Sequence, residues 1–309
     1  MIVEEGLLAL SRVPPGAMLS VGNFDGVHLG HRHILEEANR LRSDAGEIVV
    51  VTFEPHPLTV LRPDVAPPLL CSLRLKHELL ASLGVDRLIV LKPTADVLNT
   101  TAEDFFALLR DGARVRHLVE GADFNFGKAR GGNVERLREW CDRDRVDLTI
   151  VGEVRVTLTD RSSVPVSSSV IRWLVAHGRA EDAAICLGRP FTIEGIVERG
   201  EQRGRTIGFP TANIAVEEPL LLAGGVYAAR WTINGATHRV ALSVGAKETF
   251  HEQHRVVVEA YVLDFTGDLY GREARIEVVG WIRGQSKYPS LESLVEQLHR
   301  DVARVREGE

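Results

Sequence analysis

The chain has 309 residues, of which 44% are hydrophobic and 26% are charged, and its formal net charge is −6. This composition is typical of a folded globular protein, and the length favours two domains of roughly 150 residues each. The negative net charge argues against a nucleic-acid partner, because a surface that follows a phosphate backbone needs an excess of Lys and Arg. It does not exclude a small anion, which a few backbone N–H groups can hold.

Three widely separated cysteines, Cys71, Cys141 and Cys186, form no C-x-x-C pair, so neither a disulfide framework nor a zinc site is expected. A reducing, cytoplasmic location fits this pattern. The first residues include Glu4 and Glu5 and lack the basic region of a secretory signal. No apolar run reaches the roughly 18 residues that a membrane span needs, so no membrane partner is expected. The sequence leaves oligomerisation open.

The first half of the chain alternates short apolar runs with amphipathic stretches. Buried strands are predicted at Met18–Val21, Ile48–Phe53, Leu88–Leu91, His117–Glu120 and Leu148–Val151. Helices are predicted between them, at His31–Ala45, Lys76–Leu83, Ala102–Arg110 and Val134–Cys141. Strands that alternate with helices favour an α/β domain with a parallel sheet covered on both faces.

The pattern changes near residue 188, after two short helices predicted at Val170–His177 and Ala180–Leu187. Beyond that point β-branched runs dominate, and strands are predicted at Thr192–Val197, Val226–Ile233, Arg239–Val244, Val256–Leu263 and Ala274–Trp281. Asn234–Gly235 between two of these strands predicts a tight hairpin, because both residues tolerate positive φ. Several strands joined by turns favour a small all-β barrel.

A closing helix is predicted after the barrel. Its apolar stripe consists of Leu291, Leu294, Val295, Leu298 and Val302. The sequence therefore predicts a first domain at residues 1–187 and a second domain at residues 188–309.

The segment VGNFDGVHLGH, residues 21–31, lies between the first predicted strand and the first predicted helix. Gly22 and Gly26 allow close approach of the backbone, and the helix N-terminus offers N–H groups and a partial positive charge. Together these features predict a phosphate site. The segment is neither a Walker loop nor the dinucleotide G-x-G-x-x-G pattern.

Two histidines of this segment, His28 and His31, can both donate hydrogen bonds to phosphate oxygens. Nucleotidyl transfer needs mainly stabilisation of charge on the phosphates, so such donors suit it. Taken as an isolated H-x-x-H, the same residues with His33 would also fit a metal cluster or a group of surface histidines. The strand–loop–helix context favours the phosphate site.

Four segments in order resemble the prokaryotic bifunctional riboflavin kinase/FAD synthetases. Residues 21–31 resemble the GxFDGxHxGH signature of the nucleotidyltransferase superfamily. TFEPHP at 52–57, GADFNFGKARGG at 121–132 and VSSSVIR at 166–172 match three further family segments. The resemblance implies a Rossmann-like nucleotidyltransferase domain that uses ATP to adenylate FMN to FAD.

The resemblance also implies roles for single residues. The catalytic residues that it implies are His28, His31 and Arg172. The ATP-binding residues that it implies are Gly22, Asn23, Phe24, Asp25, Gly26, Asp123, Ser168 and Ser169, of which the last stands where the family usually has Thr. An apolar slot for the flavin ring is expected from Phe53, Pro55, His56, Phe124 and Phe126, although Phe residues at strand ends are more often plain core.

The segment RGRTIGFPTAN, residues 203–213, holds the chemistry predicted for the second domain. Thr211 and Asn213 offer hydroxyl and amide oxygens, which are hard ligands suited to Mg²⁺ that carries ATP phosphates. Taken alone, the stretch also fits an ordinary turn. It resembles the GRTLGFPTAN motif of riboflavin kinases, and the resemblance implies that Gly204, Thr211 and Asn213 bind Mg·ATP.

Two further segments, GVYA at 225–228 and VEAYVLDFTGDLY at 258–270, match the kinase family in order. The resemblance places the catalytic carboxylate on the second of them, and Glu259 is the expected residue. A carboxylate among apolar neighbours is costly without a partner or a task, and deprotonation of the ribityl 5′-hydroxyl of riboflavin suits a general base. An alternating strand would also let Glu259 face solvent. Arg283 is expected at the flavin.

One segment departs from the family. Residues 245–250 read GAKETF where the family has GTNPTF or GTKPTF, so Ala246 lacks a hydroxyl and Glu248 replaces a rigid Pro. The predicted function is phosphorylation of riboflavin to FMN, followed by adenylation of FMN to FAD. One alternative is an FAD synthetase whose barrel binds flavin without kinase activity. Another is an adenylyltransferase for a different phosphorylated compound, such as nicotinamide mononucleotide.

Overall fold

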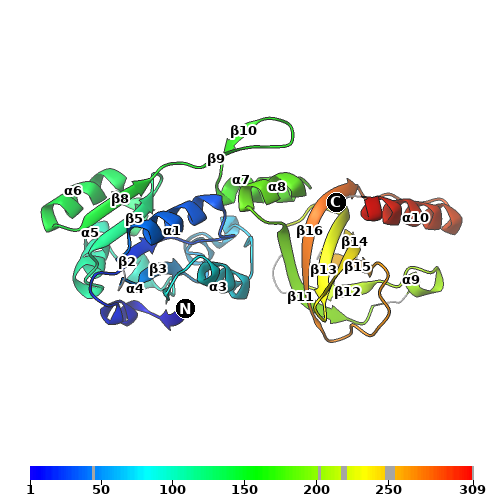
Figure 1. Ribbon diagram of the computed structural model, residues 1–309, viewed down its shortest axis with the longest axis horizontal. Coiled ribbons are helices and arrows are strands. Elements are labelled where there is room, and N and C mark those ends of the chain that lie inside the picture. Colours follow the sequence, from blue (N-terminus) through cyan, green and yellow to red (C-terminus); the bar gives the residue numbers. More distant parts are fainter. Residues whose placement is uncertain (44–45, 201–202, 217–220, 248–254, 308–309) are drawn as a thin grey trace. The chain divides into compact units, whose positions relative to one another are not determined.

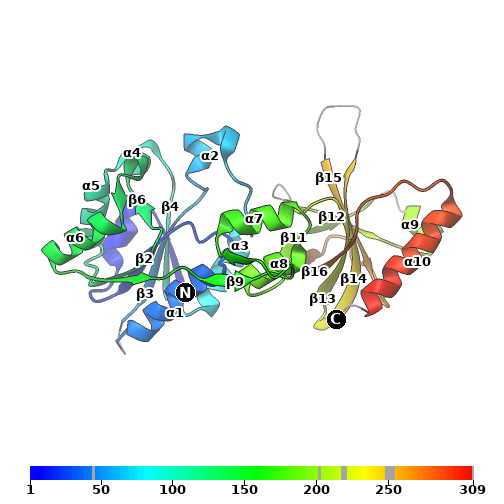
Figure 2. The same ribbon diagram turned by 90° about the horizontal axis from the view of Figure 1, so that it is seen from above.

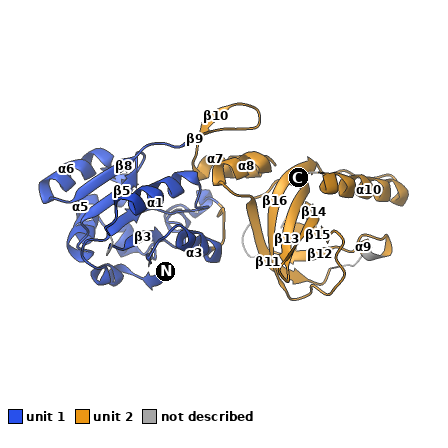
Figure 3. Cartoon of the chain, viewed as in Figure 1, with its two compact units in different colours: residues 1–67, 73–155 blue, residues 68–72, 156–309 orange. Residues whose placement is uncertain are grey.

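The computed structural model describes residues 1–43, 46–200, 203–216, 221–247 and 255–307 (Figure 1). The chain divides into two compact units (Figure 3). Unit 1 consists of residues 1–67 and 73–155, and unit 2 consists of residues 68–72 and 156–309. Helices α7 (Ser168–Ala176) and α8 (Ala180–Leu187) thus group with unit 2. The domain boundary between residues 187 and 188 stays a prediction.

Unit 1 is built on a six-stranded parallel sheet in the order β1–β4–β3–β2–β5–β8. Its strands are β1 (Ile2–Glu5), β2 (Met18–Val21), β3 (Ile48–Phe53), β4 (Arg87–Leu91), β5 (His117–Gly121) and β8 (Asp147–Val151). All residues of β2 and β4 are buried, as expected for a parallel sheet covered on both faces. The predicted parallel sheet is confirmed. The short, exposed edge strand β1 was not predicted.

Helical segments cover both faces of this sheet (Figure 2). On one face α1 (Leu29–Leu41) and α3 (Leu73–Ser82) contribute Leu35, Ala38 and Leu80 to a hydrophobic cluster. The cluster on the other face is contributed mainly by η1 (Leu7–Arg12), α5 (Ala102–Ala107), η3 (Leu108–Gly112) and α6 (Val134–Asp144). The first helix begins two residues before the predicted start, because His28 caps it. The end predicted at residues 44–45 lies outside the described residues.

Shorter elements complete unit 1 and lead into unit 2. They are α2 (Leu58–Leu61), η2 (Pro63–Val65), α4 (Ala95–Asn99), β6 (Asn125–Phe126), η4 (Lys128–Arg130), β7 (Gly132–Asn133), β9 (Arg155–Thr157) and β10 (Ser163–Pro165). β6 pairs with β7, and β9 pairs with β10, so two small hairpins follow the fourth and fifth predicted strands.

Unit 2 contains a closed barrel in the strand order β11–β12–β15–β14–β13–β16, with antiparallel pairing throughout. Its elements are β11 (Phe191–Glu198), α9 (Arg203–Thr206), β12 (Ala212–Ala215), β13 (Gly225–Ile233), β14 (Ala236–Lys247), β15 (Arg255–Val262), β16 (Glu273–Arg283) and α10 (Leu291–Glu307). The predicted small Greek-key barrel is confirmed. Helix α10 packs beside β13 and β14, as predicted for a closing helix (Figure 1).

Two local features of the barrel test the sequence patterns directly. Asn234 and Gly235 have φ values of 51° and 82° and connect β13 to β14, which confirms the tight hairpin. Strand β12 was not predicted, because Pro210 stands two residues before it and breaks the β-branched pattern. This strand carries Asn213.

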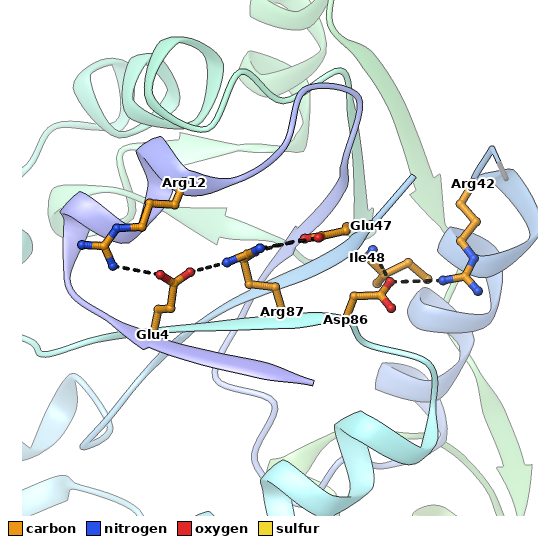
Figure 4. A network of polar contacts seen from close by, with 7 residues as sticks. All are labelled: Glu4, Arg12, Arg42, Glu47, Ile48, Asp86 and Arg87. Carbon is orange, nitrogen blue, oxygen red and sulfur yellow. Dashed lines mark hydrogen bonds and ion pairs between the residues drawn. The ribbon is translucent and has the colours of Figure 1, made fainter. Parts of the chain in front are cut away.

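A network of ion pairs joins the amino ends of β3 and β4 to the edge strand (Figure 4). Arg87 on β4 donates to Glu47 at 3.0 Å and also pairs with Glu4 on β1. Glu4 accepts a second charged hydrogen bond from Arg12 at 2.8 Å. Hydrogen bonds from Arg12 and Arg87 lower the pKa of Glu4. The network therefore fixes the edge of the sheet near the amino ends of the central strands.

The cysteines and the lengths of the helices bear on the cellular environment of the protein. Cys71, Cys141 and Cys186 are buried, and none of these three forms a disulfide bond. Within the part of the chain that the structure describes, no helix has the length and hydrophobicity needed to cross a bilayer.

Candidate functional site

The loop between β2 and α1 is the predicted phosphate loop, and its backbone is strained. His28 caps α1, because its Nδ1 accepts a hydrogen bond from the His31 N–H at 3.4 Å. The remaining N–H groups of the first turn have no partner within the helix and suit an anion. Phe24 and Val27 have φ values of 48° and 40°, which cost free energy for residues with a Cβ. Such strain is concentrated at functional sites.

The structure brings the two predicted histidines together. The rings of His28 and His31 stack with centroids 3.7 Å apart and planes at 16°. His28 is 6% exposed, and His31 is half-buried. The Phe24 ring lies 4.8 Å from the His31 ring and is 1% exposed, so Phe24 supports the histidine pair from the core. A Cβ at Gly22 would come within 3.2 Å of that Phe24 ring, which is closer than an ordinary van der Waals contact.

The phosphate loop is bound to the TFEPHP segment that follows β3. The Thr52 hydroxyl donates to the Asn23 carbonyl oxygen at 3.1 Å, and the Asn23 side-chain amide lies 3.1 Å from His56 Nε2. His56 Nδ1 in turn accepts from the Leu58 N–H at 3.1 Å. Among the described residues, the buried Oδ1 of Asn23 has no hydrogen-bond partner. The two loops therefore form one polar unit at the carboxyl ends of β2 and β3.

The segment after β5 contributes both polar and aromatic side chains. Asp123 is exposed. Phe124 is half-buried and stacks on Phe126 with ring centroids 5.1 Å apart. Phe126 is only 7% exposed and contacts Trp140 and Phe105 in the core. Phe126 thus lies among core residues, and the assignment of both rings to the flavin stays a prediction.

The VSSSVIR segment lies in unit 2 at the start of α7. The Ser167 hydroxyl caps this helix by accepting from the Val170 N–H at 3.3 Å, which leaves Ser168 and Ser169 in the first turn. Arg172 lies one turn further and is half-buried. Its Nε donates to the Pro68 carbonyl oxygen at 2.8 Å. Ser168 and Arg172 are four residues apart and therefore lie on the same face of α7, and their contact with phosphates stays a prediction.

In the barrel, the GFPTAN segment is fixed by backbone contacts. The Phe209 N–H donates to the Gly204 carbonyl oxygen at 2.8 Å, and a Cβ at Gly204 would lie 2.2 Å from the Phe209 carbonyl oxygen. Only glycine fits at this position. The Phe209 ring packs against Tyr261 on β15 and His299 on α10, with centroids 5.3 and 5.0 Å away. These contacts hold the loop that leads to Thr211.

The barrel brings Asn213 and Glu259 together. Asn213 on β12 pairs with Glu259 on β15, and Glu259 also pairs with Ser243 on β14. Residues directly opposite in an antiparallel ladder share one face of the sheet. Val258 and Ala260 are buried, so the half-buried Glu259 lies on the outer face of the barrel. The outward orientation that the alternating pattern allows is therefore observed, with polar neighbours on both sides.

A cavity of about 440 Å³ opens beside the predicted kinase residues. Thr211 and Pro210 line it, together with Phe265, Asp268 and Tyr270. The volume is in the range of small-molecule sites. Thr211 is therefore accessible from a space that can hold part of a substrate.

The guanidinium group of Arg283 is held by other groups of the protein. Its Nε and Nη2 donate to the carboxylate of Asp301 at 2.9 and 2.6 Å, and its Nη1 donates to the Gly284 carbonyl oxygen at 2.9 Å. Asp301 lies on α10 and is 2% exposed. Arg283 thus joins β16 to the closing helix, and its assignment to the flavin stays a prediction.

Two predicted features are limited by the extent of the structure. Residues 245–247 end β14, and residues 248–250 of the GAKETF segment lie outside the described residues. Among the residues that are described, no three His, Cys, Asp or Glu side chains are close enough to hold a metal ion. A metal cluster of His28, His31 and His33 is therefore not supported.

Comparison with known proteins decides the family. A model described as FAD synthetase matches residues 10–168, and one described as riboflavin kinase matches residues 187–308. The bifunctional riboflavin kinase/FMN adenylyltransferase of Listeria monocytogenes is 36% identical over 292 residues, which cover 92% of this chain and 90% of the relative. The chain belongs to the family of bifunctional riboflavin kinase/FMN adenylyltransferases.

Further comparisons agree with this family. The bifunctional riboflavin kinase/FMN adenylyltransferase of Escherichia coli is 34% identical over 308 residues, 98% of this chain and 96% of the relative. A crystal structure from Streptococcus pneumoniae, described as a macrolide-efflux protein, has a TM-score of 0.88 and 28% identity and covers 100% of both chains. The resemblance predicted from the motifs is therefore confirmed over nearly the whole chain.

One buried acid of this bifunctional riboflavin kinase/FMN adenylyltransferase was missed by sequence reasoning. Glu120 at the end of β5 is 1% exposed. Its Oε1 accepts from the Val21 N–H at 2.8 Å, and its Oε2 lies 3.5 Å from the Ser20 hydroxyl. Burial raises the pKa of Glu120 well above its usual value. Glu120 therefore fixes the last residue of β2, where the phosphate loop begins. A Glu in an otherwise apolar strand was the available signal.

Proposed function

We propose that this chain phosphorylates riboflavin to FMN and adenylates FMN to FAD, using ATP in both reactions. The observation that carries the proposal is the presence in one chain of two different polar arrangements that suit phosphate. One is the strained loop at the N-terminus of α1, with the stacked pair His28 and His31. The other is the barrel row in which Asn213 lies opposite Glu259. They occur in the order of the two family domains.

In the adenylation step, an oxygen of the FMN phosphate attacks the α-phosphorus of ATP. A new P–O bond forms, the bond to the β-phosphate oxygen breaks, and pyrophosphate leaves. No protein nucleophile is required. His28, His31 and the N–H groups of α1 stabilise the charge that develops on the phosphates. Ser168 and Arg172, four residues apart on one face of α7, are proposed to contact ATP phosphates.

The loops beside His28 and His31 are proposed to contact the flavin of FMN and the adenosine of ATP. Pro55 and His56 are proposed to contact the flavin together with Phe53, Phe124 and Phe126. The Asn23 side-chain amide lies 3.1 Å from His56 Nε2 and joins these loops to one another. Asp123 and residues 22–26 are proposed to hold the nucleotide.

In the kinase step, Glu259 is proposed to accept the proton of the ribityl 5′-hydroxyl while that oxygen bonds to the γ-phosphorus of ATP and ADP leaves. Thr211 and Asn213 are proposed ligands of the Mg²⁺ that accompanies ATP. The donor set fits, because the hydroxyl, the amide and the neighbouring carboxylate all offer oxygen, and Mg²⁺ uses few protein ligands when phosphates and water supply the rest. When bound, this ion neutralises charge on the phosphates.

The division of labour is proposed to follow residues 1–187 for adenylation and 188–309 for the kinase. Three buried cysteines that form no disulfide bond support a reducing, cytoplasmic location.

A product analysis tests the function. The full chain is incubated with riboflavin, ATP and MgCl₂, and the flavins are separated by chromatography. FMN should appear first and FAD should follow, and a chelator should stop the formation of both. Absence of both products would reject the proposal. Formation of FAD only from added FMN would reject the kinase and leave a barrel that merely binds flavin.

A further inference from the structure

A lysine occupies a core position of helix α3. The buried residues of this helix are Leu75, Lys76 and Leu80, and Lys76 is only 2% exposed. Burying an ammonium group is costly unless a counter-ion is placed against it. Lys76 Nζ donates to Glu54 Oε2 at 3.0 Å. The adenylation mechanism proposed above gives this ion pair no task.

The partner of Lys76 is the first residue of the loop that follows β3. The Glu54 backbone N–H donates to the Leu91 carbonyl oxygen of β4 at 3.1 Å, which extends the sheet by one residue. Its carboxylate is 20% exposed and turned to α3. Glu54 is therefore held through both its backbone and its side chain. The next two residues, Pro55 and His56, are the exposed and half-buried residues proposed to contact FMN.

The far side of the same loop is held by the phosphate loop, through the 3.1 Å contact between His56 and Asn23. The loop of residues 54–57 thus has one anchor on α3 and a second on the phosphate loop. We propose that Lys76 is a positioning residue for FMN in adenylyl transfer, and that it acts by fixing Glu54. The proposal rests on the adenylation function and on the flavin-contacting role of residues 55–56 argued above.

A matched control exists in the same sheet. Arg87 is 9% exposed and also pairs with carboxylates, namely Glu47 and Glu4 (Figure 4). It lies at the amino end of β4, whereas Glu54 follows the carboxyl end of β3. If Lys76 only stabilises the fold, then Lys76→Met and Arg87→Met should affect adenylation alike. If Lys76 positions the loop, only Lys76→Met should alter the use of FMN.

The experiment measures kcat and KM for FMN in FAD formation by the full chain and by the Lys76→Met and Arg87→Met variants. The melting temperature of each sample reports whether the variant is folded, and kinase activity reports whether the barrel is intact. For Lys76→Met we expect KM for FMN to rise about tenfold and kcat to fall less than about threefold, because ground-state positioning is lost. Arg87→Met should lower the melting temperature and leave KM within about twofold of the wild type.

A second pair of variants keeps the test decisive. Glu54→Gln retains an oxygen for Lys76 and should fold even where Lys76→Met does not, with a KM for FMN raised about threefold. The double variant Lys76→Met, Glu54→Gln should show a smaller rise in KM than Lys76→Met alone, because the unpaired carboxylate is removed.

If KM for FMN were unchanged in both Lys76→Met and Glu54→Gln, the inference would be overturned. It would also be overturned if Arg87→Met raised KM for FMN as much as Lys76→Met does. Failure of the wild type to form FAD would instead overturn the proposed function.

Discussion

The parallel sheet of unit 1 and the barrel of unit 2 assemble their polar side chains in different ways. In the sheet, β3, β2 and β5 are neighbours, so the loops after their carboxyl ends meet at one edge. In the barrel, Asn213 and Glu259 come together because the register places them opposite each other. A site of the first kind is built from contiguous loop residues. A site of the second kind depends on pairing between distant strands.

The supporting contacts differ accordingly. The loops of unit 1 are held by buried polar side chains from below, as Glu120 holds Val21 and Lys76 holds Glu54. In the barrel, Asn213 and Glu259 are held in place by the backbone pairing of β12 with β15. Substitutions of these buried supporting residues should therefore change how well unit 1 uses its substrates. The activity of the barrel should respond mainly to substitutions of Asn213 and Glu259 themselves.

The largest expected effect comes from a substitution in the barrel, and it distinguishes the reaction of the barrel from that of the sheet. Glu259→Ala removes the proposed general base, a group that contributes roughly 10²- to 10⁴-fold to rate, so FMN formation from riboflavin should fall by that factor. FAD formation from added FMN should stay within about twofold of the wild type, because other residues perform it. Separate assays with riboflavin and with FMN check this. Glu277→Gln, an exposed acid on β16, is the control and should retain both activities.

The reciprocal change is made in the phosphate loop. His28→Ala removes a phosphate donor and the cap of α1, and FAD formation should fall roughly 10²- to 10³-fold, the usual loss for one such donor. FMN formation should be retained. The exposed His33 on the same helix provides a control, and His33→Ala should keep both activities. If either His28→Ala or Glu259→Ala abolished both reactions in a folded protein, the separation of the two regions would be wrong.

A smaller effect concerns the buried support of the phosphate loop. Glu120→Ala leaves the Val21 N–H without its acceptor and should lower the free energy of unfolding by about 1–3 kcal/mol. Glu120→Gln keeps an acceptor for Val21 and a donor for Ser20, so it should be close to the wild type at low pH. Urea denaturation of the three proteins measures these differences, and equal losses for Ala and Gln would contradict the assigned hydrogen bond.

The pH dependence of the Glu120→Gln comparison has a definite sign. Burial raises the pKa of Glu120 in the folded state, so its contribution to stability is complete below the unfolded pKa and is lost as pH rises through the folded pKa. Gln cannot ionise and escapes this loss. The stability of Glu120→Gln relative to the wild type should therefore increase as pH rises, and a constant difference would argue that Glu120 ionises equally in both states.

The smallest effect reports the charge of Lys76. Burial lowers the pKa of His77, the Lys76 charge lowers it further, and Glu54 raises it. Lys76→Met removes one of the lowering causes and leaves Glu54, so the pKa of His77 should rise. A histidine titration followed by NMR measures the shift. A fall in the pKa would show that the Lys76 charge is not felt at this site.

Much of this architecture followed from the sequence, because its signals are local. The apolar runs at 18–21, 48–53 and 117–120 predicted buried parallel strands, and Asn234–Gly235 predicted the hairpin that is observed. The motif at residues 21–31 indicated the family, which is confirmed, whereas its role at phosphates stays a prediction. These features depend on residue patterns within one turn or one strand, which a linear sequence displays directly.

Only the tertiary structure revealed which polar residues support the sites. Nothing in the spacing of Lys76 and Glu54, or of Glu120 and Val21, marks them as pairs. The position of Asn213 opposite Glu259 likewise required a strand that the preceding proline concealed. Burial and cross-strand register are set by groups far apart in the chain. The free-energy cost of an unpaired buried charge or donor becomes visible only when those groups are brought together.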